Sequence, residues 1–203
     1  MARCASGFAN NLELSPLLVV RASNLIVPIV VEVCAPTQVS ARRRELFMRL
    51  VREGGEVDAH SLPRLVDRAL ALGFAFRADD LVAVGGVKRP NAGHRARVFA
   101  SAGVAMDPGK FEFELGWVYV IPDARDQHVS TRLVEALMQN IGEAQVYATS
   151  RVNNERMHAL FARLEFAPVG EPYPSKLNEP NIQLFVRERH THGADGNKPG
   201  ADG

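Results

Sequence analysis

A short polar segment at 123–128 separates an apolar strand pattern from an apolar helix pattern. The helix pattern begins at Val129, so the polar segment leads directly into its first turn. The first N–H groups of a helix have no internal partner and together carry about half a positive charge. Arg125 adds a guanidinium suited to paired donation to phosphate oxygens, and the imidazole of His128 can also donate. We therefore expect a loop that can hold a pyrophosphate group.

The residues before this loop predict a buried strand. From 113 to 121, bulky side chains alternate with smaller or acidic ones, which is the two-residue period of a pleated strand. This pattern predicts one continuously bulky face and places Glu114 on the opposite face. Pro122 ends the strand because it has no N–H to donate.

The composition limits the class of protein. A chain of 203 residues with 46% hydrophobic and 23% charged residues suits one globular domain with a sizeable core. We predict an N-terminal extension at 1–24, the domain at 25–189 and a disordered tail at 190–203, which has almost no apolar content. The net charge of +1 gives no electrostatic reason to expect DNA or an anionic membrane as a partner.

The cysteines and the apolar segments bear on localisation. Cys4 and Cys34 are too few and too far apart for a disulfide framework or a metal cluster, which indicates a reducing, cytoplasmic compartment. The apolar region 17–34 is interrupted by charged residues and a proline, whereas a spanning helix needs roughly 20 apolar residues. We expect neither a membrane span nor a secretory signal.

Hydrophobic periodicity and turn residues predict the other elements in chain order. Gly85-Gly86 inside the third strand indicates a bulge or a close backbone approach. The expected elements are a strand at 25–33, a helix capped by Ser40 that stops at Gly54-Gly55, a second helix from Ser61 that closes at Gly73, a hairpin of 74–77 and 81–88, a long connection at 89–110 with a short helical turn around Val98, a helix at 129–141, a strand at 145–149, a helix capped by Asn153, a strand from Phe166 to Val169, a turn at 171–180 and a last strand at 181–186.

Two segments carry a resemblance to a known family. The loop Arg125-Asp-Gln-His128-Val-Ser130 resembles the (Gln/Arg)-x-x-Gly-x-(Gly/Ala) loop of the GCN5-related N-acetyltransferases, although in a degenerate form, since His128 and Ser130 depart from the pattern. The segment 146–166, with Asn154 before a helix, resembles the second signature of the same family. The order of elements from 25 to 187 is similar as well. The resemblance implies an α/β (α+β) acyl-CoA N-acyltransferase fold, with a mixed central sheet splayed between strands 4 and 5 and helices on both faces.

The resemblance also implies a cosubstrate, acetyl-CoA or another acyl-CoA, and no metal. Asn154 matches the position that hydrogen-bonds the pantetheine or phosphate end of the cosubstrate. Unpaired backbone groups of Val118 and Val120 are expected to bind the pantetheine arm as a pseudo-strand. The diphosphate is expected at Arg125 and at the loop and first helical turn, where the residues are Gln127, His128, Val129, Ser130 and Thr131.

Acyl transfer to an amine needs a general base, and the departing thiolate accepts a proton. By its place on the fourth strand, Glu114 matches the glutamate that acts as base in several members of the family, with Glu112 as the fallback. Phe161 stands where the family commonly has a tyrosine that acts as general acid. A phenyl ring has no proton to donate, so we expect Phe161 in the core. The proton then comes from Tyr173, from Tyr147 or from water.

The leading hypothesis is an acetyltransferase that acts on a primary amine of a small molecule or a peptide. The alternative is a catalytically degenerate member of the fold that serves as an acyl-CoA sensor or a protein-interaction module. An RNA-directed acyltransferase rests only on the arginines at 42–44 and 95–97. The sequence leaves open whether the protein forms a homodimer.

Overall fold

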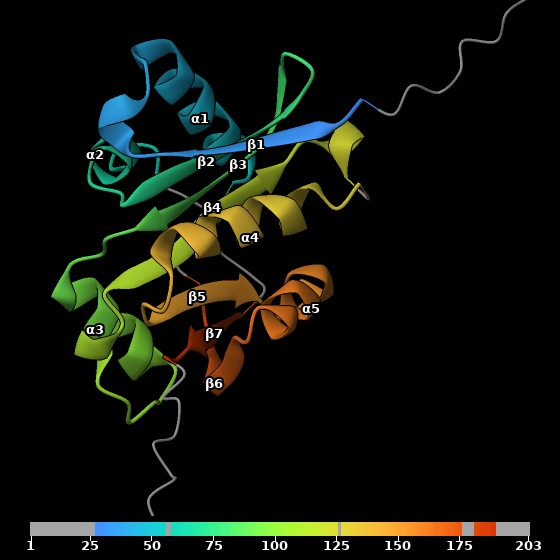
Figure 1. Ribbon diagram of the computed structural model, residues 1–203. Coiled ribbons are helices and arrows are strands. Elements are labelled where there is room, and N and C mark those ends of the chain that lie inside the picture. The colour runs from blue at the N-terminus through green and yellow to red at the C-terminus, as the bar shows by residue number, and fades with distance from the viewer. Residues whose placement is uncertain (1–26, 56–57, 126, 176–180, 190–203) are drawn as a thin grey trace, which may run out of the picture.

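A mixed sheet organises the computed structural model, which describes residues 27–55, 58–125, 127–175 and 181–189 (Figure 1). Within these residues the sheet has seven strands in the order β1-β2-β3-β4-β5-β7-β6. β4 and β5 pair in parallel, and all other neighbours pair antiparallel. The strands are β1 (Ile29–Cys34), β2 (Ala71–Arg77), β3 (Asp80–Lys88), β4 (Phe113–Val120), β5 (Val146–Arg151), β6 (Ala167–Tyr173) and β7 (Ile182–Arg187). The predicted extension at 1–24 and tail at 190–203 lie outside the described residues.

Helices cover both faces of this sheet, as predicted. One face carries α4 (Val129–Ile141) and α5 (Glu155–Arg163), whose apolar stripes pack on the sheet in the largest core cluster. The other face carries α1 (Ala41–Glu53) and α2 (Leu62–Asp67) over one part of the sheet and α3 (Ala92–Ser101) over another. Short 3-10 turns η1 (Pro36–Gln38), η2 (Pro108–Lys110) and η3 (Pro122–Ala124) complete the chain.

The second face therefore has two separate apolar clusters. The first joins α1 and α2 to β2 and β3 through Phe47 and Phe74, which meet edge to face. The second joins α3 to β5 and β7 through Phe99 and Tyr147, which also meet edge to face. β4 lies between the two clusters: Trp117 and Tyr119 pack against the first cluster, whereas Glu114 and Gly116 belong to neither.

A β-bulge in β4 divides the strand into two halves. Gly86 pairs with Gly116, whereas Val84 pairs with Tyr119, so β4 has one residue more than β3 in this interval. The extra residue is Trp117, which has a positive φ of 57°. A one-residue shift exchanges the faces of a strand. Consequently Leu115 and Val118 contact the α4 side, while Trp117 and Tyr119 contact the α1 side.

This bulge corrects one prediction and confirms another. The expected continuous bulky face of β4 is wrong, because the register shift moves the second half of the pattern to the opposite face. The expected bulge or close approach at Gly85-Gly86 is confirmed. A Cβ on Gly86 would lie 2.8 Å from Cε3 of Trp117, so glycine leaves room for the indole ring.

The splay of the sheet follows directly after the paired part of β4. Only 113–115 of β4 pair with 146–148 of β5, although both strands continue for several residues. Bulges bend a strand and increase its local twist, which turns β4 away from β5 here. The predicted gap between strands 4 and 5 is therefore present.

Two predicted elements differ because tertiary pairing overrides the local pattern. The second helix ends at Asp67 and not near Gly73, since Leu70 already donates to Val87 of β3 and Gly73 lies within β2. The long connection at 89–110 contains a ten-residue helix, α3, and not a short turn. Its N-cap is Asn91, whose Oδ1 accepts from the backbone of His94.

Two further boundaries are corrected. The cap of α5 is Asn154 and not Asn153, because the Asn154 side chain accepts from the backbone N–H of Met157. β6 continues to Tyr173 through residues predicted as a turn. It is an edge strand with an irregular register, which is where a strand tolerates Pro172.

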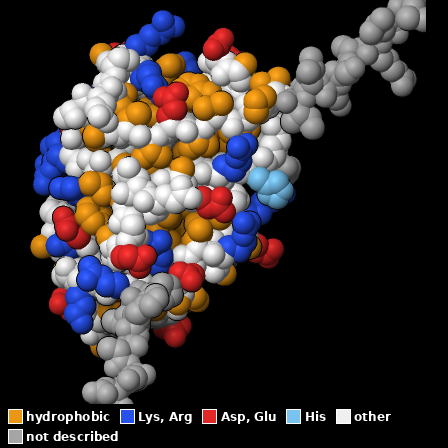
Figure 2. Space-filling model, in the orientation of Figure 1, with side chains coloured by type: hydrophobic (Ala, Val, Ile, Leu, Met, Phe, Trp, Pro, Cys, Tyr) orange, Lys and Arg blue, Asp and Glu red, His pale blue; other side chains and the backbone are white. Residues whose placement is uncertain are grey.

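Figure 2 shows the surface on the α4 side of the molecule, where positive and negative side chains are interspersed among apolar ones. This mixture agrees with the net charge of +1.

A glycine pair offers a test of how α3 is joined to β6. Gly170 and Gly103 both have φ near +65°, but a Cβ on Gly170 would overlap the carbonyl oxygen of Ala102, whereas Gly103 faces open space. We expect Gly103→Ala to lower the free energy of unfolding by about 1 kcal/mol through the backbone conformation alone. Gly170→Ala should lower it by a further 1–3 kcal/mol or so because of the clash. Urea denaturation of both variants measures the difference, and equal effects would contradict the close approach.

Candidate active site

A cavity of about 410 Å³ lies on the sheet face that α1 and α3 cover. β4 lines it from Glu114 to Tyr119, and the end of β5 and the start of α5 line its other side. α3 contributes residues spaced by three and four positions, which share one helix face: His94, Arg97, Val98 and Ser101. The cavity therefore contains both the paired part of β4 and the part beyond the splay.

Three neighbouring strands each place one polar side chain in a row across the sheet. Lys88 of β3 stands opposite Glu114 of β4, and Glu114 stands opposite Tyr147 of β5. Nζ of Lys88 donates to Oε1 of Glu114, and the hydroxyl of Tyr147 donates to Oε2 over 3.2 Å. Nε2 of His94 lies 3.4 Å from the same Oε2. Glu114 is only 4% exposed, so this network surrounds a buried carboxylate.

The surroundings of Glu114 fix its charge. Burial alone raises the pKa of Glu114, but the ammonium of Lys88 and the hydrogen bond from His94 outweigh burial and lower this pKa to about 2. The carboxyl group is therefore ionised at neutral pH. Its negative charge favours a proton on any acid nearby.

The two tyrosines near Glu114 show this effect. Burial, together with the charge of Glu114, raises the pKa of Tyr147 far above its ordinary value. The same two causes raise the pKa of Tyr173 to about 12. Both hydroxyls keep their proton at neutral pH, but Tyr147 is fully buried and bonded to Glu114, whereas Tyr173 lines the cavity.

The predicted catalytic residues are thus brought together in part. Glu114 and Tyr173 line the same cavity, at its β4 and β6 walls. The fallback base, Glu112, is exposed just before β4 and is not among the cavity-lining residues. Phe161 is buried in the core against Phe166 and Phe185, as predicted, and its edge also reaches the cavity.

Of the predicted binding residues on β4 and at the start of α5, two line the cavity and one does not. Val118 and Asn154 line the cavity. The Asn154 Oδ1 accepts the helix-cap hydrogen bond from Met157, which leaves its amide NH₂ for other partners. Val120 lies outside the cavity lining, and its carbonyl accepts from Nε of Arg125 over 3.3 Å.

The polar loop enters α4 as predicted. Arg125, Gln127 and His128 are exposed, and Val129, Ser130 and Thr131 form the first turn of α4. His128 is the N-cap and has left-handed backbone angles, φ 55° and ψ 21°. This conformation is common for glycine and uncommon for other residues, and histidine is among the side chains that tolerate it best. The loop thus has a glycine-like backbone in spite of the imidazole.

Sequence reasoning missed three cavity residues. Lys88 ends an apolar strand, and its pairing with Glu114 depends on a register that the bulge sets. His94 lies within the predicted long connection at 89–110, whereas in the structure it belongs to α3, which directs it to the carboxylate. Ser150 is 6% exposed and lines the cavity, and its Oγ has no hydrogen-bond partner among the described residues. A buried hydroxyl of this kind generally has a partner, which a ligand in the cavity can supply.

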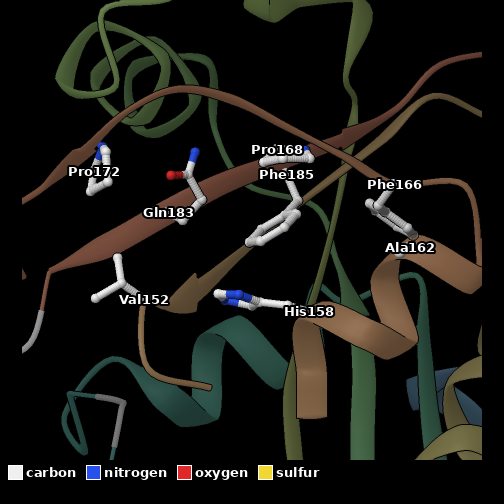
Figure 3. Close-up of a pocket in the computed structure, with 8 residues that line it drawn as sticks. All are labelled: Val152, His158, Ala162, Phe166, Pro168, Pro172, Gln183 and Phe185. Atoms are coloured by element: carbon white, nitrogen blue, oxygen red, sulfur yellow. The ribbon is translucent and has the colours of Figure 1, made fainter. Parts of the chain in front are cut away.

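A second hollow, of about 430 Å³, lies between α5 and the β6-β7 edge (Figure 3). The ring of His158 is part of its lining. This ring packs on Phe185, and its Nε2 lies 3.0 Å from the Arg151 carbonyl oxygen. The hollow contains no ionised carboxylate and no residue predicted for catalysis or binding, so we assign the chemistry to the cavity at Glu114.

Two further features of the described residues bear on the class of protein. No three His, Cys, Asp or Glu side chains in the described ranges are grouped so that they could hold a metal ion. In the same ranges, no helix has the length and apolar character needed to cross a membrane.

The comparisons with known proteins agree with this fold. The model of the acetyltransferase (GNAT) family matches residues 45–166. No curated protein sequence matches the chain. Among solved structures, an acyl-CoA N-acyltransferase from Pseudomonas aeruginosa superposes with a TM-score of 0.58 at 15% identity and covers 79% of this chain and 99% of its own. The ribosomal-protein-S18-alanine N-acetyltransferase from Escherichia coli gives 0.55 at 14% identity and covers 83% of this chain and 100% of its own. NAA60 of Arabidopsis thaliana in complex with acetyl-CoA gives 0.56 at 14% identity and covers 78% and 97%.

The lowered pKa of Glu114 predicts how stability depends on pH. Because its folded pKa of about 2 lies below the ordinary 4.5, ionised Glu114 stabilises the fold above pH 5, and this contribution is lost as the pH falls toward 2. Its size is roughly 3 kcal/mol for a shift of this extent. We expect the urea-derived free energy of unfolding to fall between pH 5 and 3, and to fall less in Glu114→Gln. Glu135→Gln, which removes a partly exposed partner of Arg163, should keep the wild-type dependence; the same slope in all three proteins would contradict the assignment.

Proposed function

Because the chain belongs to the acetyltransferase (GNAT) family, we propose that it transfers an acetyl group from acetyl-CoA to a primary amine, with Glu114 as general base. Members of this family use an acyl-CoA as cosubstrate. The observation that carries the proposal is the buried, ionised carboxylate of Glu114 in a cavity that begins where β4 and β5 separate. The acceptor is a small molecule or a peptide with a free amine.

Three features of the cavity fit the pantetheine arm of the cosubstrate. Beyond Leu115, β4 has no pairing with β5, so its backbone can pair with an added strand-like ligand. Val118 lies on this part of β4. Across the gap, Ser150 has a buried hydroxyl without a partner among the described residues, and Asn154 has an amide that can donate. These groups would hold the amide-rich arm between the two strands.

The start of α4 would hold the diphosphate. The N–H groups of Val129, Ser130 and Thr131 lie in the first turn, where the helix dipole favours an anion. His128 has the left-handed conformation that an amide-lined loop requires, and its imidazole adds a donor in place of the free space left by glycine. Arg125 and Gln127, both exposed, flank this loop. We therefore propose a degenerate but functional loop.

The proposed reaction is direct attack. The acceptor amine gives a proton to Glu114, its nitrogen forms a bond to the thioester carbonyl carbon, and the carbon–sulfur bond breaks. The nitrogen loses its second proton as the amide forms, and Tyr173 takes up this proton while it passes its own proton to the departing sulfur. The relay must be concerted, because a hydroxyl whose pKa is raised to about 12 is a weaker acid than a thiol. Thiolates leave readily near neutral pH, so the contribution of Tyr173 is smaller than that of the base. The ion pair with Lys88 makes Glu114 a weak base in the resting structure, which the acceptor site must change during turnover.

Binding of acetyl-CoA tests the first half of the proposal. At a hundred times its dissociation constant, acetyl-CoA should add about 2.7 kcal/mol to the free energy of unfolding, whereas adenosine should add little. Arg125→Ala should weaken acetyl-CoA binding by about 10- to 150-fold if the guanidinium donates to a phosphate, because a charge-assisted hydrogen bond contributes about 1.5–3 kcal/mol. Arg132→Ala removes an exposed arginine one turn further along α4 and should have little effect. No stabilisation by any acyl-CoA would favour the alternative, a degenerate protein-interaction module.

Kinetics test the second half. Glu114→Gln should lower kcat by about 10²–10⁴ while the affinity for acetyl-CoA is kept, because it removes the base and not the cosubstrate site. Tyr173→Phe should lower kcat by a smaller factor. Steady-state rates with a panel of amines, together with acetyl-CoA titrations, separate the two effects. A Glu114→Gln variant that keeps the full rate would exclude Glu114 as the base. If wild type and variant both bind acetyl-CoA but neither transfers the acetyl group to any amine, the result would indicate an acyl-CoA sensor.

A further inference from the structure

The proposed reaction requires an amine beside Glu114, and that position is already filled. A base that takes a proton from an amine must lie within about 3 Å of its nitrogen. In this structure the nitrogen bonded to Oε1 of Glu114 is Nζ of Lys88. Lys88 stands opposite Glu114 in the β3–β4 register, and its side chain is 22% exposed. A primary amine of the protein thus occupies the place that the acceptor must take.

The backbone around the bulge makes room for this amine inside the cavity. A Cβ on Gly116 would lie 2.8 Å from Cε and 2.9 Å from Nζ of Lys88, so a larger residue at 116 would force the end of the Lys88 side chain to shift. Nζ also lies 5.5 Å from the centre of the Trp117 ring, on the bulge itself. The same cavity, at the point where β4 separates from β5, is lined by Lys88, Glu114, Gly116 and Trp117.

We propose that Lys88 is itself an acetyl acceptor, so that the protein acetylates its own active-site lysine. This inference rests on the proposed function, because it needs acetyl-CoA in the cavity and Glu114 as base. A thioester held so that an amine on Glu114 can attack it is also within reach of Nζ of Lys88. Proximity of this kind makes the intramolecular reaction fast compared with that of a lysine in free solution.

The Lys88 ammonium gives one proton to Glu114, which returns it to solvent, and the nitrogen forms a bond to the carbonyl carbon of the thioester. The carbon–sulfur bond breaks, and the sulfur takes a proton from Tyr173. The nitrogen loses its second proton as the amide forms, and this proton restores Tyr173. The products are N-acetyl-Lys88, free coenzyme A and one proton in solvent.

Acetylation changes the site that carries it. The amide of acetylated Lys88 has no positive charge, so Glu114 loses the ammonium that holds it as a weak base. The place beside Oε1 then has no competing cation. An external amine is thereby able to bind Glu114 with its own ammonium, and the modified protein is the better catalyst for a second acceptor.

Isotope labelling of the full chain tests the inference. The protein is incubated with acetyl-CoA that carries ¹³C in its acetyl group, and its peptides are quantified by mass spectrometry. Lys110 is the internal control, because it is exposed on η2 and reports the uncatalysed rate. We expect one labelled acetyl group on Lys88, added about 10²-fold faster than on Lys110, which is the smaller factor that a positioned base supplies.

Two variants identify the cause of the labelling. Glu114→Gln removes the base and should lower the labelling of Lys88 to the level of Lys110. Gly116→Ala keeps both Lys88 and Glu114 but pushes the ammonium away from the carboxylate, so it should lower the labelling as well. Thermal stabilisation by acetyl-CoA, measured for each variant, shows that it is folded and still binds the cosubstrate.

The outcomes separate this inference from the proposed function. Labelling of Lys88 no faster than Lys110, in a protein that binds acetyl-CoA and acetylates an added amine, overturns the inference and leaves the function intact. Equal labelling of Lys88 in wild type and Glu114→Gln also overturns it, because the reaction is then chemical and not catalysed. A protein that binds no acetyl-CoA loses both proposals.

Discussion

The extra residue in β4 is the constraint on which the rest of the structure depends. Trp117 adopts a positive φ, which is strained for a bulky side chain, and the register on its two sides differs by one residue. The bulge lies two residues after Leu115, the last residue that pairs with β5. One local distortion therefore ends the β4–β5 ladder, exposes backbone groups of β4 and moves two aromatic side chains to the face that carries Glu114.

The helices on that face complete what the bulge begins. α1 and α2 form one apolar cluster, which reaches Trp117 and Tyr119 of β4, and α3 forms another; neither includes Glu114 or Gly116. Residues 114–119 of β4 line the cavity, together with residues of α1 and α3. α3 also supplies His94 to the carboxylate, so a helix between two antiparallel strands both shapes the cavity and sets its charge. The opposite face, packed by α4 and α5, stays a continuous core.

How much of this could be predicted from the sequence depends on the range of the interactions involved. The apolar stripe of α4, its glycine stop and the loop before it are local patterns, and the structure has them where the sequence places them. The family resemblance supplied the splay between strands 4 and 5, which no periodicity in the chain encodes. The burial of Glu114 and its ion pair with Lys88 depend on cross-strand register, and the register depends on a bulge whose position Gly85-Gly86 indicates only loosely.

The end of the second helix is also set by a long-range interaction that the local pattern does not encode. Its pattern continues toward Gly73, but Leu70 gives its N–H to Val87 of β3, and the chain changes from helix to strand. α3 was missed because its apolar positions are few and its inward face is partly polar, which is what a cavity wall requires. Elements that bury an apolar face can be read from a sequence, whereas an element that lines a polar cavity lacks that signal.

The buried charges at Glu114 and Lys88 are better explained by function than by stability. Desolvation costs several kcal/mol for each ion, and well-packed apolar residues often serve a fold at least as well as a buried ion pair. The hydrogen bonds from Tyr147 and His94 offset part of that cost. What the carboxylate provides is a fixed negative charge in a site of low dielectric, where it holds an ammonium and adds to the effect of burial in raising the pKa of Tyr173. In the proposed reaction this one desolvated charge bears on both proton transfers, because Glu114, the proposed acceptor, is ionised and Tyr173, the proposed relay, keeps its proton in the resting structure.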